Sequence, residues 1–381
     1  MASFFWFRKQ CVSVSLVALL SVLAACGGDD PVDPSDTGEG DSDVELVSDL
    51  IFDNITLEQS DEQGILRWRM IADQALYSQD RRDATIEQPS GQFFQGEEPA
   101  FAVRADRGEV KQDGNKLVLV GNVVITDEDT GATITGDRMR WVPEDNTIVL
   151  LNNISADHPD FKLTAQEIMV WVDEDRVEIS GDVKAETTDE SLQFNGEQVV
   201  WFLEEERLTS DRPVRFQQRQ DDKVTARAQG NEVEYDIKNQ LATLNNDAVV
   251  VLQDPPVRVT GDALQFNQAN NTVLASKRFT VFHQAEKINM VANEGRGNLD
   301  KEVFKMNGNV VVTAERNQAR LRSDQLTWTV PTQGIVAEGN VIYRQTDPVF
   351  NLKGPRAVGK LEDETIVVSG GRVVTEIIPG S

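Results

Sequence analysis

The chain of 381 residues contains almost no cysteine or histidine. Its two cysteines, Cys11 and Cys26, both lie in the first 26 residues, so the rest of the chain has no disulfide and no thiol chemistry. The two histidines, His158 and His283, have no neighbouring cysteine or histidine, which argues against a metal site. Glycine-rich phosphate loops and nucleophile elbows are also missing. We therefore expect no cofactor, no metal and no catalytic residues, and we interpret the chain as a protein other than an enzyme.

Positive charge is scarce as well. The chain has 37 basic and 64 acidic residues, a net charge of −27, which argues against a nucleic-acid partner. Residues 29–45 carry eight acidic side chains and no lysine or arginine, with proline and glycine between them. Such a segment buries too little apolar surface to order itself. We predict that residues 27–49 form an acidic, flexible tether.

A short apolar run, Val12–Ala25, follows Arg8 and Lys9. Its 14 residues are too few to cross a bilayer as a helix and are typical of a signal peptide. The run ends in Leu-Ala-Ala-Cys, which resembles the bacterial lipoprotein box. Residues 1–26 are thus predicted to be a lipoprotein signal peptide with Cys26 as the lipidated residue. An ordinary cleaved signal and an uncleaved anchor are the alternatives.

The rest of the chain repeats one short phrase ten times. The phrase is an apolar residue, a spacer, a small residue, an acid or amide, a spacer, an apolar residue, a spacer and a large apolar residue. Its polar position recurs at steps of 29 to 34 residues, most often 31. The ten polar positions are Asp73, Asp106, Asp137, Gln166, Glu197, Asn231, Asp262, Asn293, Asp324 and Pro355. A fixed period of this length indicates one structural unit stacked many times.

Within each unit apolar and polar residues alternate as they do in β-strands. At the centre of the phrase, the positions expected to be buried switch from even to odd residue numbers. Ile134 and Gly136 are even-numbered, whereas Met139 and Trp141 are odd-numbered. A straight strand would point these pairs to opposite faces, so burying all four requires a bend at the small residue. We predict an all-β fold over residues 50–378, an elongated V-shaped antiparallel β-jellyroll of about ten repeats of ~31 residues. Such a stack would be on the order of 100 Å long.

These features resemble the lipopolysaccharide-transport bridge family, the OstA-like proteins that include LptC and LptA. The resemblance rests on the phrase and on the Gly-Asn-Val starts at Gly121, Gly308 and Gly339, and the stretch from Glu58 to Tyr77 looks most like LptC. It implies a periplasmic protein of a Gram-negative-type envelope. Such a protein accepts lipopolysaccharide from an inner-membrane ABC transporter and passes it toward the outer membrane along an apolar groove. Family members usually have fewer units, and LptC usually has a transmembrane helix, so the sequence leaves both the inner and the outer membrane as the place where Cys26 is anchored.

By this resemblance, the interior of the V holds acyl chains, and the partner proteins pair with its two end strands. The residues expected to line the interior are Tyr77, Met139, Trp141, Val170, Val199, Trp201, Val233, Tyr235, Leu264, Phe266, Leu326 and Trp328. The residues expected at the two partner edges are Ile55, Leu57, Val373, Val374 and Thr375. A second bridge protein of the same fold is the partner expected there.

Two questions stay open at this point. The aromatic positions fit ordinary jellyroll core as well as a groove lining, and the chain fits a surface or periplasmic lipoprotein that serves as a scaffold or binds polysaccharide. Unit eight has Gly295 and Gly297 where unit three has Met139 and Trp141. This missing bulk is consistent with a wider groove, a lateral opening or weak strands.

Overall fold

The computed structural model describes residues 50–61, 63–78, 82–95, 98–111, 116–127, 130–142, 147–315, 318–346, 349–360, 365–369 and 374–377. The predicted signal peptide, Cys26, the tether and Val373 lie outside these residues. The described strands form one 28-stranded sheet in which every pairing is antiparallel. The all-β, antiparallel fold expected from the sequence is confirmed. No helix in the described part of the chain has the length and apolar character needed to cross a membrane.

Fourteen strands run without interruption through a bend. They are β1 (Leu50–Ser60), β2 (Leu66–Tyr77), β7 (Lys116–Thr126), β8 (Thr133–Val142), β9 (Thr147–Asp157), β10 (Phe161–Trp171), β11 (Arg176–Thr187), β12 (Leu192–Phe202), β17 (Leu241–Leu252), β18 (Val257–Asn267), β23 (Val303–Ala314), β24 (Ala319–Thr329), β25 (Gly334–Thr346) and β26 (Val349–Lys360).

The remaining strands come in pairs, each equivalent to one bent strand broken at its corner. The pairs are β3 (Ala84–Glu87) with β4 (Ser90–Gln95), β5 (Glu98–Arg104) with β6 (Arg107–Lys111), β13 (Arg207–Ser210) with β14 (Val214–Gln220), β15 (Lys223–Gly230) with β16 (Glu232–Asp236), β19 (Thr272–Ala275) with β20 (Phe279–His283), β21 (Ile288–Ala292) with β22 (Glu294–Asn298), and β27 (Thr365–Ser369) with β28 (Val374–Ile377). Two 3-10 turns, η2 (Val172–Glu174) and η3 (Val330–Thr332), join long strands.

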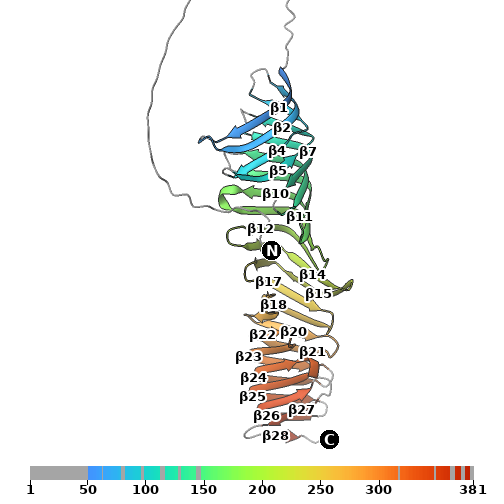
Figure 1. Cartoon of the computed structure of the whole chain (residues 1–381). Coiled ribbons are helices and arrows are strands. Elements are labelled where there is room, and N and C mark those ends of the chain that lie inside the picture. The colour runs from blue at the N-terminus through green and yellow to red at the C-terminus, as the bar shows by residue number, and fades with distance from the viewer. Residues whose placement is uncertain are drawn as a thin grey trace, which may run out of the picture.

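The bent strands stack into a long column with β1 at one end and β28 at the other (Figure 1). One copy of the repeated phrase falls in every second bent strand, so each repeat contributes two strands. In β8 the residues on both sides of the bend are buried: the even-numbered Ile134 and Gly136 and the odd-numbered Met139 and Trp141. The bend predicted from the parity change is therefore confirmed.

The corner itself has a defined backbone. In six of the strands that follow a phrase strand, two consecutive residues at the corner have positive φ, for example Gly121 and Asn122 at 82° and 43°. The pairing register with the neighbouring strand shifts at this point. Glycine and asparagine adopt this left-handed conformation at low cost, which explains the recurrent Gly-Asn. The next residue is then fully buried, as with Val123 at 0% and Val341 at 1% exposure.

The acid or amide of the phrase stabilises the corner of the next strand. Asn122, Asn153 and Asn340 each donate a side-chain hydrogen bond to the phrase aspartate sixteen residues earlier, at 2.7 or 2.8 Å. A Cβ atom added to Gly121 would lie 2.6 Å from a carboxylate oxygen of Asp106. The acid thus covers the corner glycine, so the polar position of the phrase has a structural role.

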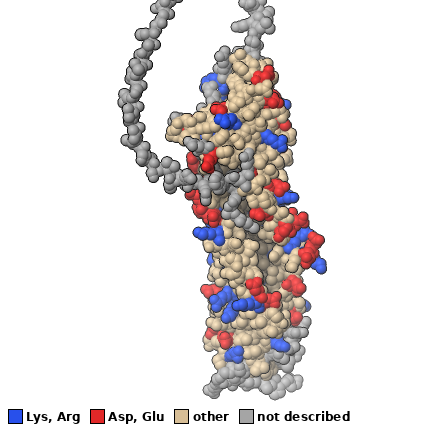
Figure 2. All heavy atoms as spheres, in the orientation of Figure 1, with Lys and Arg blue, Asp and Glu red and all other residues tan. Residues whose placement is uncertain are grey.

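The core is divided into two clusters along the column. The N-terminal core consists of buried side chains from Trp68 to Val183, and the C-terminal core of those from Val214 to Ala357. Phe194 packs against both cores from its place in β12. Outside the cores, lysine, arginine, aspartate and glutamate side chains are interspersed along the visible face (Figure 2).

Candidate functional site

The candidate site is the apolar interior between the two arms of the bent strands. In the N-terminal core, Trp141 packs edge-on against Trp68 and Phe93, with ring centroids 6.5 and 5.7 Å apart. In the C-terminal core, Trp328 lies against His283 and Phe304 at 5.8 and 5.7 Å. These aromatic clusters fill the interior where they occur. Both tryptophans are at most 5% exposed.

The structure places the expected lining residues in three different environments. Met139, Trp141, Val170, Val233, Leu264, Leu326 and Trp328 are buried in the two cores. Tyr77, Val199, Trp201 and Tyr235 are half-buried. Phe266 is 38% exposed. The set therefore does not form one uniform surface, and its role in binding a ligand stays a prediction.

The half-buried lining residues concentrate in the central segment, which we define as β12 to β16, residues 192–236. From residue 184 to residue 209 no residue is buried, although every one of them is described. In the central segment Phe194 pairs across strands with Phe216, and their ring centroids are 5.2 Å apart. Both rings are half-buried. The interior is thus less tightly packed here than in either core.

The corners of the bent strands remain packed through this region. Val183 and Val214 are 1% exposed, and Ala248 is 0% exposed. The loss of packing therefore occurs along the arms, at Phe194, Trp201 and Phe216, and not at the bend. One contributing cause is the residues that oppose these rings. Phe216 faces Ala228 in the register, and Gln218 faces Ala226, so small or polar side chains stand where the cores have large apolar ones.

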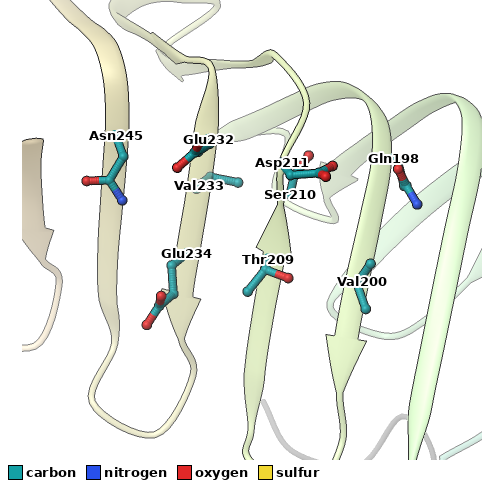
Figure 3. A pocket seen from close by; sticks show the side chains of 9 residues that line it. All are labelled: Gln198, Val200, Thr209, Ser210, Asp211, Glu232, Val233, Glu234 and Asn245. Carbon is teal, nitrogen blue, oxygen red and sulfur yellow. The ribbon is translucent and has the colours of Figure 1, made fainter. Parts of the chain in front are cut away.

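A polar pocket of about 370 Å³ lies at the corner of the central segment. It forms where β13 ends at Ser210 and β14 begins at Val214, so the wall of the sheet is interrupted beside β12. Figure 3 shows its side chains on β12, β13, β16 and β17, with Asp211 just after the end of β13. The pocket is lined by Gln198, Val200, Thr209, Ser210, Asp211, Glu232, Val233, Glu234 and Asn245. Its three carboxylates make it unsuitable for a hydrocarbon chain.

Two titrating groups border the central segment. Burial, and secondarily the nearby carboxylate of Asp236, raise the pKa of Tyr235 above 10.0, so its phenol is neutral at physiological pH. In the turn before β12, the Thr187 hydroxyl and Ser191 lower the pKa of Asp189 to about 2 by donating hydrogen bonds. No group of three or more metal-binding side chains occurs among the described residues.

The glycines of unit eight do not leave an opening. A Cβ atom at Gly295 would clash with the ring of Phe279, and one at Gly297 would clash with the ring of Phe304. These rings come from neighbouring strands and occupy the space of the missing side chains. The wider groove and the lateral opening considered for unit eight are therefore wrong. The loosely packed interior lies in unit five, whose phrase contains Phe194, Val199 and Trp201.

The two ends of the column present the expected partner edges. Among the described strands, β1 pairs only with β2, and its Ile55 and Leu57 pack against the N-terminal core. At the other end, Val374 and Thr375 of β28 pair with Lys353 and Leu352 of β26. Docking of a partner at either edge stays a prediction.

Comparison with known proteins identifies a family for the first part of the chain. Residues 16–188, less than half of the chain, match the family described as LptC: Lipopolysaccharide-assembly, LptC-related. The matched region ends five residues after the N-terminal core. The resemblance expected from the sequence is confirmed there. That description names an assembly role, which agrees with the expectation that the chain is a protein other than an enzyme.

No match was found among curated proteins. Solved structures similar to this chain include LptH from Pseudomonas aeruginosa, described as the LptA homologous periplasmic component of the lipopolysaccharide transport device. It is 12% identical, and the match covers 37% of this chain and 79% of LptH with a TM-score of 0.19. That score is too low to support a conclusion about the present fold.

Proposed function

We propose that this chain, whose residues 16–188 are LptC-related, is a periplasmic bridge protein for lipopolysaccharide. It accepts the glycolipid from an inner-membrane ABC transporter of the Lpt type and passes it toward the outer membrane. The acyl chains travel along the interior of the V, and the polar part of the glycolipid stays outside. The family match supports this role in the coarse sense of lipopolysaccharide assembly.

One observation carries the proposal. Inward apolar side chains follow one another from Trp68 to Ala357, and Phe194 joins the two cores that they form. A hydrocarbon chain gains roughly 25 cal/mol for each Å² of apolar surface it buries. Because that gain does not depend on direction, an acyl chain is held with similar strength at successive positions along such a face. The interior therefore suits a cargo that must move.

The ends of the chain have matching roles in this proposal. Cys26 carries the lipid anchor, and the 23-residue tether (27–49) lets the column stand up to about 80 Å from it. The free edge of β1 receives the upstream partner by strand addition, and β28 receives a second jellyroll bridge protein. Photo-reactive residues at Val374 and Thr375 are expected to capture that second protein in cells.

A scaffold or polysaccharide-binding lipoprotein is the second candidate. The observation that favours it is the filling of both cores by aromatic rings, with Trp141 and Trp328 at most 5% exposed. A scaffold needs only a closed core, whereas a bridge needs its arms to separate as the cargo passes. The two functions therefore differ in whether lipid ever reaches the interior.

Photo-crosslinking in cells separates them. A photo-reactive residue in place of Trp201 is expected to form an adduct with lipopolysaccharide. Glu197 of the same strand is exposed on the outside of the corner and provides the matched control. Adducts at Trp201 but not at Glu197 support the bridge. Absence of adducts at Trp201, at Val199 and at Met139 would contradict it and favour the scaffold.

A further inference from the structure

In the central segment the interior face of the bent strands is accessible to solvent. In unit three the phrase residues Ile134, Met139 and Trp141 are 7%, 1% and 5% exposed. In unit nine, Leu321, Leu326 and Trp328 are 6%, 1% and 2% exposed. The equivalent residues of unit five, listed here in the same order, are all half-buried: Phe194, Val199 and Trp201. Equivalent positions in different copies of the repeat therefore differ in their exposure to solvent.

We propose that the central segment is a lateral binding site for a single hydrocarbon chain, where an acyl tail enters or leaves the interior. The proposal rests on the proposed function and specifies where along the column the exchange takes place. The site is formed by Phe194 and Trp201 of β12, Phe216 of β14 and Tyr235 of β16. Trp141 and Trp328 are buried and close the arms in units three and nine, whereas Phe266 of unit seven, at 38% exposure, continues the accessible face beyond the central segment.

The geometry selects the class of ligand. Trp201 packs against the N-terminal core and Phe216 against the C-terminal core, and Phe194 contacts both. Packed sheets are about 10 Å apart, so a folded partner domain does not fit between the arms. A methylene chain does fit, and it requires no hydrogen bonds from its surroundings. The corners remain packed at Val183, Val214 and Ala248, so the site is open only at the arms.

The surrounding residues explain why this place opens. Ala226 and Ala228 oppose Gln218 and Phe216 in the register, so Phe216 has only a small cross-strand partner on β15. Burying the exposed part of these rings under an acyl chain would stabilise the complex through the area removed from water. Neutral Tyr235, whose pKa is raised by burial, adds no charge to the site.

Tryptophan quenching by a brominated fatty acid tests the site in the purified full chain. Bromine quenches only tryptophans close to the bound acyl chain. The chain has six tryptophans, of which Trp141, Trp201 and Trp328 occupy the same position of the repeat. We expect Trp201→Phe to remove most of the quenching, whereas Trp141→Phe and Trp328→Phe retain it.

The other possible results distinguish failure of the lateral site from failure of the bridge function. Quenching that is reduced equally by all three substitutions would overturn the lateral site but leave the bridge function standing, since the whole interior would then be open. Quenching dominated by Trp141 or Trp328 would have the same meaning. An absence of quenching in the unsubstituted chain would overturn both proposals.

A charge placed in the site provides a second measurement. Phe216→Glu is expected to weaken binding of the fatty acid at least tenfold, because a carboxylate would stand against the apolar chain. Arg215→Glu is the matched control, since Arg215 is the neighbouring residue on the exposed face of the same strand. Equal binding by both variants would overturn the site.

Discussion

Trp201 and Trp328 occupy the same position of the same repeat, yet one is half-buried and the other is 2% exposed. The backbone at the two places is alike: both lie on bent strands of the same sheet, and the corners beside both are packed. The difference comes from side chains that other strands supply. The rings of Phe304 and His283 cover Trp328, whereas the cross-strand partners of Trp201 are the smaller, non-aromatic Val177 and Leu208. The repeat thus sets the shape of the column, and the residues around it set where the interior is accessible.

The largest expected effect is on the stability of the closed region. Trp328→Ala should lower the free energy of unfolding by about 3–5 kcal/mol, the usual result of emptying a buried aromatic site. Trp201→Ala should cost about 1–2 kcal/mol, because less of its surface leaves water on folding. Urea unfolding of the two variants measures the difference. Equal losses would show that the central segment is packed as tightly as the cores.

Corner substitutions should affect both regions alike. Gly339→Ala and Gly181→Ala each place a side chain at positive φ against the polar residue of the preceding phrase, and each should cost about 1–3 kcal/mol. Gly131 has a φ of 74° but no atom within 4 Å of the added Cβ, so Gly131→Ala should cost about 1 kcal/mol. Thermal unfolding is the measurement. If Gly339→Ala or Gly181→Ala lost no more stability than Gly131→Ala, the close contact between the corner glycine and the polar residue of the phrase would be contradicted.

The corner hydrogen bonds should contribute less. Asp324→Ala removes the acceptor of the 2.7 Å bond from Asn340, at an expected cost of about 0.5–1.5 kcal/mol. In the central region, Asn231 donates to Asp247 at 3.1 Å, and Asn231→Ala should cost a similar amount. Amide hydrogen exchange at the two corners gives the local free energies. A much larger effect at one corner would mean that the corners of the two regions are not equivalent.

The smallest effect concerns the turn that enters the central segment. Asp189 accepts hydrogen bonds from the Thr187 hydroxyl at 2.6 Å and from the Ser191 amide at 3.0 Å, and its pKa falls from 3.8 to about 2. A depressed pKa stabilises the folded state above pH 3.8, and this contribution is lost as the pH falls toward 2. Unfolding midpoints of the unsubstituted chain and Asp189→Asn should therefore differ slightly at neutral pH and converge in acid. A difference that grows in acid would contradict this assignment.

The periodic features of the fold were predictable from the sequence because they depend on residues within one phrase. The parity change from Gly136 to Met139 indicated a bend, and small residues indicated its position. The glycines of unit eight were misleading because Phe279 and Phe304, outside the phrase, fill the space. The accessible interior in unit five was missed for the same reason: its own residues are large and apolar. The residues that indicate the accessible interior lie on other strands: Gln218 of β14 and Ala226 and Ala228 of β15.

The most direct test of a continuous interior path places a charge at the junction of the two cores. Phe194→Asp is introduced into cells that carry a photo-reactive residue at Met139 in the N-terminal core or at Leu326 in the C-terminal core. If acyl chains pass from one core to the other along the interior, lipopolysaccharide adducts persist at Met139 and are lost at Leu326. Undiminished adducts at Leu326 would contradict passage through the junction.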